Sequence, residues 1–156
     1  MSERLALAGR IRASLEDIKM AVNRTVALAE KARRSGDDDY WDGVALNLHG
    51  FYSGVEQIFE DIARTIDGGL PSDAEWHTSL LRQMTVEMGK LRPAVIQMET
   101  RQALDEYRGF RHIVRNVYAF NLRPARLNEL AFDAPECLSK LTIDLLAFAH
   151  FLEETA

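Results

Sequence analysis

The apolar side chains of this chain recur every three or four residues, and this spacing constrains the fold more than any other feature. The longest run without a slip consists of Val44, Leu48, Phe51, Val55, Ile58, Ile62 and Thr65. Because three to four residues make one helical turn, such a run places its apolar side chains on one face of an α-helix. Strand-like alternation and βαβ patterning are missing, so the sequence predicts an all-α protein.

Turn and capping signals delimit the first three helices. A first helix of about 30 residues is expected to end near Arg34. The second run stops at the Asp-Gly-Gly segment 67–69, which is typical of a helix C-terminus. The Ser-Asp-Ala-Glu segment 72–75 predicts a capping box for a third helix that reaches about Leu91.

Proline residues delimit the rest of the chain. Pro93 interrupts the helical pattern, and we expect a fourth helix to begin near Thr100. It should end before the Asn-Leu-Arg-Pro segment 121–124, because a residue ahead of proline is pushed out of the helical region. A short helical turn over 124–130 is then expected, and the Asp-Ala-Pro-Glu segment 133–136 predicts the start of the last helix.

These elements predict an antiparallel bundle of four to five helices in a single domain over residues 1–156. A chain of this length closes a core without disulfides or a structural metal, and the lone Cys137 favours a reducing compartment. The first ten residues lack the apolar core of a signal peptide, and no stretch is apolar enough to span a membrane. We therefore expect a cytoplasmic protein without membrane contact.

The net charge of −5 argues against nonspecific binding to a nucleic acid backbone. Residues 101–130 are the exception, because they hold six arginines and only three acids, a balance of +3 that leaves −8 for the rest. Any surface that handles phosphate groups is expected within this segment.

The basic residues of this segment gather on one side of the fourth helix. When Phe110 is set at 0° on a helical wheel, the buried face is predicted within about 60° of it, where Ile113, Val114 and Val117 lie. The arc that points away from the core holds Arg108, Arg111, His112, Arg115 and Asn116.

Arginines and a histidine on one face suit phosphoryl transfer within RNA. Guanidinium groups neutralise a pentacoordinate phosphorane, and the imidazole of His112 moves protons near neutral pH. Asn116 is a candidate to hold a phosphate oxygen or the 2′-hydroxyl. Without further information, a solvated arginine-rich face with an ordinary surface histidine explains the same pattern.

Longer stretches of the sequence resemble a known family. The segment 107–122 (YRGFRHIVRNVYAFNL) is similar to the motif-bearing helix of HepT-like proteins in the HEPN superfamily. The segments 49–59 (HGFYSGVEQIF) and 67–71 (DGGLP), together with Trp76-His77, resemble the second and third helices of the same family. The likeness thus covers most of the chain. It implies a metal-independent ribonuclease toxin whose partner is a minimal nucleotidyltransferase antitoxin.

The family motif is an arginine followed after four to six residues by a histidine, often with a tyrosine two positions further. Arg111 is in register and Tyr118 matches the tyrosine, but Asn116 stands where the histidine is expected after four intervening residues. An asparagine does not exchange protons at neutral pH. Either His112 takes over the acid/base role, or catalysis is weak or absent.

The resemblance implies partners and a modification as well as an activity. The leading hypothesis is an endoribonuclease toxin in which Arg111 and Arg115 hold the scissile phosphate, Arg108 adds substrate contact, His112 transfers protons and Asn116 orients the substrate. The antitoxin is then expected to transfer AMP to Tyr118. One alternative is a catalytically silent HEPN binding module that serves as partner or modification target of a nucleotidyltransferase, and another is a purely structural bundle.

The remaining aromatic and histidine residues allow more than one interpretation. The predicted second helix carries more aromatic side chains than one buried stripe can cover, namely Phe51, Tyr52 and Phe59. They either widen the contact with the core or form part of the homodimer that the resemblance implies. Trp76-His77 either reaches the active face or lets Trp76 pack under the bundle. Histidines 49, 77 and 150 lie on different helices without ligand spacing, so no metal is expected, and no phosphate loop or other motif indicates a cofactor.

Overall fold

Five α-helices make up most of the computed structural model, which describes residues 2–116 and 122–156 except for the side chains of residues 112–116. They are α1 (Glu3–Ser35), α2 (Asp39–Ile62), α3 (Trp76–Gln83), α4 (Met98–Asn116) and α5 (Pro124–Glu154), and a π-helical turn, η1 (Ala63–Asp67), extends α2. The described residues contain no strand beyond one isolated bridge. The predicted all-α helical bundle is confirmed.

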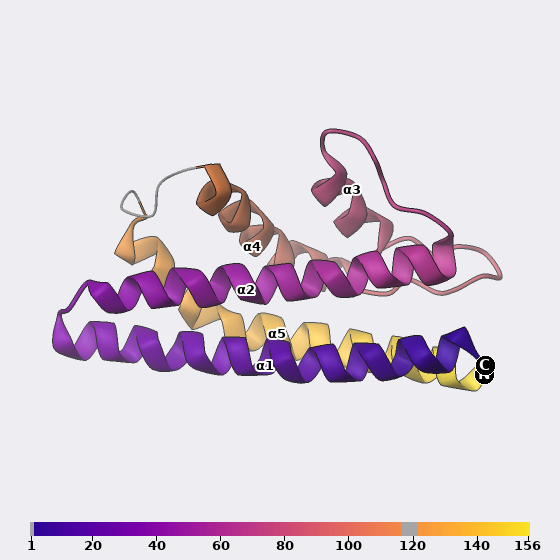
Figure 1. The fold of residues 1–156 in the computed structure, drawn as a ribbon, viewed down its shortest axis with the longest axis horizontal. Helices are drawn as coiled ribbons and strands as arrows, with labels where there is room; N and C mark the ends of the chain where they lie inside the picture. Colours follow the sequence, from indigo (N-terminus) through magenta and orange to yellow (C-terminus); the bar gives the residue numbers. More distant parts are fainter. Residues whose placement is uncertain (1, 117–121) are drawn as a thin grey trace.

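The three long helices lie side by side, and the two shorter ones cover one side of them. Figure 1 shows α1 and α2 as an antiparallel hairpin, with α5 running along α1 so that both termini meet at one end. α3 and α4 pack on the outer side of α2. α2 therefore contacts each of the other helices, which explains why its stripe is the most regular in the sequence.

The ends of the first hairpin follow from local capping chemistry. The Ser2 side chain accepts a hydrogen bond from the Arg4 amide at the start of α1. At the other end, Gly36 has φ 71° and donates its N–H to the Ala32 carbonyl. The glycine signal after α2 is also confirmed, because Gly68, at φ 84°, bonds to the Ala63 carbonyl.

The prediction for the third helix is wrong in two respects. α3 ends at Gln83 instead of continuing to Leu91. The predicted capping box is not formed: Glu75 occupies the N-cap position without a side-chain cap, and Asp73 instead accepts a hydrogen bond from the Ser79 hydroxyl.

A buried ion pair explains why α3 stops early. Arg92 Nε lies 2.6 Å from Asp67 Oδ1, and the two side chains are 0% and 2% exposed. The guanidinium also donates to the backbone carbonyls of Gln83, Val86 and Pro93. These bonds require the chain to fold around Arg92 as a loop, which a continuing helix would prevent.

The start of α4 is fixed by a side chain of α5. Asp144 Oδ2 accepts a hydrogen bond from the Gln97 amide at 2.9 Å and from Thr100 Oγ1 at 2.6 Å. α4 accordingly begins at Met98, two residues before the expected position. The predicted end near residue 121 lies outside the described residues.

α5 is one continuous helix, so the predicted break before 133–136 is wrong. Pro135 lies inside it and removes one backbone hydrogen bond, at a cost of about 3 kcal/mol. The buried stripe continues through the proline with Leu130, Ala131, Ala134 and Cys137. Packing of this stripe along α1 offsets the lost bond.

The surplus aromatic residues of α2 belong to the core of the chain. Phe51, Tyr52 and Phe59 are all at most 1% exposed. Phe51 meets the Tyr107 ring edge-on at 5.1 Å, and the Tyr107 hydroxyl donates to the Leu130 carbonyl at 2.7 Å. These aromatic side chains join α2, α4 and α5, and they are not a surface for a second copy.

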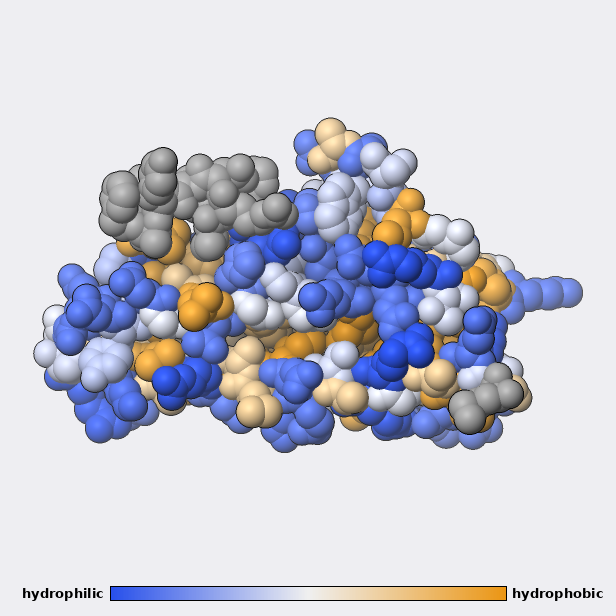
Figure 2. Space-filling view, viewed as in Figure 1, coloured by the Kyte–Doolittle hydropathy of each residue, from blue (hydrophilic) through white to orange (hydrophobic). Residues whose placement is uncertain are grey.

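The face shown in Figure 2 is largely hydrophilic, with small separate apolar areas. No helix among the described residues combines the length and apolar character needed to cross a bilayer.

Replacing Arg92 with Met should lower the free energy of unfolding by about 3–5 kcal/mol, because the buried Asp67 carboxylate would lose its opposite charge and keep only the hydrogen bond from Gln83 Nε2. Urea denaturation followed by circular dichroism measures this loss. Arg82→Met is the matched control, since Arg82 is exposed in the last turn of α3. An Arg92→Met midpoint equal to that of the control would contradict the structural role of this pair.

Candidate functional site

The described part of α4 buries Phe110, as the helical wheel predicts, whereas the other side chains of the predicted face lie outside the described residues. Its described core residues are Thr100, Leu104, Tyr107 and Phe110, which are at most 4% exposed. The centre of this face lies about 60° from Phe110, toward Tyr107. Arg111, at about 100° from Phe110, therefore falls within the arc that these buried residues span and not on the solvent side.

Arg111 packs against α2, which corrects the prediction that it points away from the core. Its side chain is 17% exposed. Nε donates to Ser53 Oγ at 3.1 Å, and Nη1 lies 3.7 Å from Glu56 Oε1. Since Ser53 and Glu56 are three residues apart on α2, both contacts come from the same helix face.

The Glu56 carboxylate joins α3 to the same position. Its side chain is 6% exposed, and Oε2 lies 2.7 Å from His77 Nδ1. The Trp76 and His77 rings stack at a centroid distance of 3.6 Å and an angle of 31°. Ser53, Glu56, His77 and Arg111 are called the Glu56 cluster below.

Tyr52 forms the inner wall beside this cluster. It lies one turn before Glu56 on α2 and is 1% exposed. Burial raises the pKa of its hydroxyl, and the Glu56 charge acts in the same direction. Tyr52 therefore stays neutral over the physiological pH range and is not the group that exchanges protons here.

Arg108 is more accessible than Arg111. Its side chain is 25% exposed, and Nε donates to Asp105 Oδ1 at 2.7 Å on the same helix. This hydrogen bond to Asp105 raises the pKa of Arg108, so the guanidinium remains charged. Arg108 and Arg126 both line a hollow of about 270 Å³.

Four predicted site residues cannot be placed as side chains. α4 continues through His112, Arg115 and Asn116, but their side chains lie outside the described residues. Tyr118 lies outside them entirely. The predicted basic cluster is thus described only at Arg108 and Arg111.

Sequence reasoning missed the Glu56 cluster as a unit. The available signal was a carboxylate directly after Val55 in the apolar stripe of the most regular helix. A buried carboxylate needs a hydrogen-bond donor or an opposite charge beside it, so a basic residue or a histidine from another helix is expected there. Of the pair Trp76-His77, His77 contacts Glu56, while Trp76 is partly buried against the core.

The described residues contain no group of three or more His, Cys, Asp or Glu side chains arranged to hold a metal ion. Within the Glu56 cluster only one carboxylate and one imidazole are potential ligands, which is fewer than a stable site uses.

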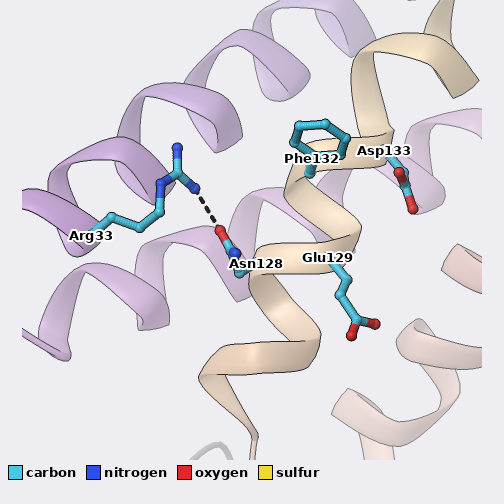
Figure 3. Close-up of a pocket in the computed structure, with 5 residues that line it drawn as sticks. All are labelled: Arg33, Asn128, Glu129, Phe132 and Asp133. Atoms are coloured by element: carbon cyan, nitrogen blue, oxygen red, sulfur yellow. Dashed lines mark hydrogen bonds between the residues drawn. The ribbon is translucent and has the colours of Figure 1, made fainter.

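A larger pocket of about 420 Å³ lies elsewhere, between the end of α1 and the first turns of α5. Figure 3 shows its lining residues, Arg33, Asn128, Glu129, Phe132 and Asp133, with Arg33 donating to the Asn128 side chain. Two acids against one arginine disfavour a phosphate ligand. None of the predicted site residues lines this pocket.

Comparison with known protein families identifies the chain. A family model described as HepT-like protein matches residues 43–152, more than two thirds of the sequence. The match runs from α2 to α5 and includes all four members of the Glu56 cluster. No curated protein and no solved structure gives a significant match. The chain belongs to the HepT-like proteins of the HEPN superfamily.

Proposed function

We propose that this protein is a metal-independent endoribonuclease toxin of a toxin–antitoxin system, with the activity held in one domain over residues 1–156. Membership of the HepT-like family suggests a toxin–antitoxin role. The observation that carries the proposal is the position of Arg111, which α2 fixes through a hydroxyl and a carboxylate. An arginine held in this way is preorganised to bind a phosphate.

The proposed roles follow the chemistry of each side chain. Arg111 and Arg115 bind the scissile phosphate, and their guanidinium groups stabilise the charge that develops in the transition state. Arg108, which is partly exposed, adds contact to the neighbouring backbone. His112 transfers protons, and Asn116 orients the substrate through its amide.

Ser53 and Glu56 occupy only part of the hydrogen-bonding capacity of Arg111. Their contacts are with Nε and Nη1, and Nη2 contributes two further N–H donors. Glu56 also offsets part of the positive charge, so Arg111 acts mainly by orientation. Affinity for RNA must then depend on further arginines of segment 101–130.

A catalytically silent HEPN module is the second candidate. The observation that favours it is Asn116, which replaces the histidine of the family motif. Such a module would still bind RNA through its arginines and serve as partner or modification target of the nucleotidyltransferase. A cleavage assay separates the two candidates.

If the first candidate is correct, purified protein cleaves RNA in the presence of EDTA. Arg111→Ala and His112→Ala should each lower the rate, by about 10² to 10⁴ for the loss of an acid/base group. Gel analysis of a labelled RNA measures the rate. Arg82→Ala and His150→Ala are matched controls, because both residues are exposed and distant in sequence from α4. Full activity of both test variants would rule out this site.

The proposed site is also expected to lie in a symmetric homodimer, because the family resemblance implies two motif helices that meet across the interface. The burial of Phe51, Tyr52 and Phe59 removes them as interface residues. Light scattering during size-exclusion chromatography at micromolar concentration should give about twice the chain mass of 17.7 kDa. A mass equal to that of the single chain would contradict the dimer.

Regulation by the antitoxin is proposed to act through Tyr118. Transfer of AMP from ATP to its hydroxyl would add a phosphodiester beside the arginines and block RNA binding. Incubation with the partner enzyme and ATP should increase the intact mass by one or more adenylyl groups. The increase should vanish in Tyr118→Phe and persist in the control Tyr40→Phe. An unchanged mass with an active partner enzyme would exclude this regulation.

A further inference from the structure

RNA cleavage by an internal hydroxyl requires two proton transfers. The 2′-oxygen attacks phosphorus, the bond from phosphorus to the 5′-oxygen breaks, and a 2′,3′-cyclic phosphate and a 5′-hydroxyl form. One group takes the proton of the 2′-hydroxyl, and another gives a proton to the leaving oxygen. In the proposed site, α4 supplies only His112, because position 116 holds an asparagine.

A second histidine is held beside Arg111 by a different helix. His77 Nδ1 and Arg111 Nη1 contact the two different oxygens of the Glu56 carboxylate, at 2.7 and 3.7 Å. α3 thus places an imidazole next to the arginine that is proposed to hold the scissile phosphate. The His77 side chain is 26% exposed, so a bound substrate can reach it.

We propose that His77, oriented by Glu56, is the second proton-transfer group of this ribonuclease site and acts on RNA together with His112. This assignment rests on the proposed endoribonuclease function. It explains how the site works although the family motif lacks its histidine at position 116.

The geometry around His77 is that of a positioned acid/base group. Because Nδ1 is engaged by Glu56, proton exchange with the substrate goes through Nε2 on the opposite side of the ring. The buried carboxylate holds the Nδ1 edge of the ring in place, as in other carboxylate–histidine pairs. The stacked Trp76 ring fixes the plane of the imidazole. Both constraints keep Nε2 in one orientation, as catalysis requires.

A purely structural role makes different predictions. In that case His77 only satisfies the buried Glu56 carboxylate, and any hydrogen-bond donor at the same place would suffice. Asparagine provides this donor, because its side-chain amide nitrogen occupies a position similar to that of Nδ1, but it does not exchange protons. His77→Asn therefore separates the two roles.

The first experiment compares RNA cleavage by the full chain, His77→Asn and the control His150→Asn between pH 5 and 9. We expect His77→Asn to fold and bind RNA like the unchanged chain, and to cleave about 10² to 10⁴ times more slowly. Its pH–rate profile should lose one of the two limbs. His150, which is 70% exposed on α5, should be replaceable without effect.

The second experiment tests proton transfer directly. Added imidazole should restore part of the activity of His77→Ala, because a diffusible base can occupy the space left by the side chain. Circular dichroism and RNA binding confirm that the variant is folded.

The outcomes distinguish this inference from the proposed function. If the unchanged chain cleaves RNA and His77→Asn retains at least half of its rate, the role of His77 is refuted and the ribonuclease function stands. If His77→Asn cleaves more slowly but keeps the pH–rate profile of the unchanged chain, and imidazole does not rescue His77→Ala, then His77 has only a structural role and the inference is refuted. If the unchanged chain cleaves no RNA at any pH, both proposals fail.

Discussion

The buried carboxylate of Glu56 is the interaction on which the arrangement of α2, α3 and α4 depends. A charged group inside an apolar helix face is costly unless hydrogen bonds and an opposite charge compensate it. Here the compensation comes from His77 on α3 and Arg111 on α4. α3 has only eight residues and would not be stable alone, so this contact helps to hold it on α2. The same carboxylate that stabilises the packing therefore also positions the candidate site.

Local signals in the sequence were sufficient to predict the first two helices, because a regular stripe and a C-terminal glycine act within a few residues. They failed where a distant residue decides the structure. α3 stops early since Arg92 must reach Asp67, a partner 25 positions away. α5 continues through Pro135 because its stripe packs on α1. Neither contact can be deduced from the residues that surround the break.

The sequence indicated which helix is basic, but it did not predict how the described basic side chains are oriented. The sequence identified α4 as the basic helix and Arg111 as its motif arginine. The helical wheel placed the middle of the buried face on the stripe from Phe110 to Val117. In the described part of α4, however, the middle of the buried face lies near Tyr107. This rotation turns Arg111 toward α2. Glu56 and His77 were not assigned together, because their contact joins segments 21 residues apart.

The Glu56 cluster changes what the loss of the motif histidine means. If acid/base chemistry came from α4 alone, Asn116 would leave His112 as the only proton-transfer group there. α3 adds His77, held by a carboxylate that also contacts the motif arginine. In the proposed site, phosphate binding and proton transfer would then both depend on the same buried group. Any partner that shifts α3 or α4 relative to α2 would disturb both functions together, so control of this site does not require contact with the substrate itself.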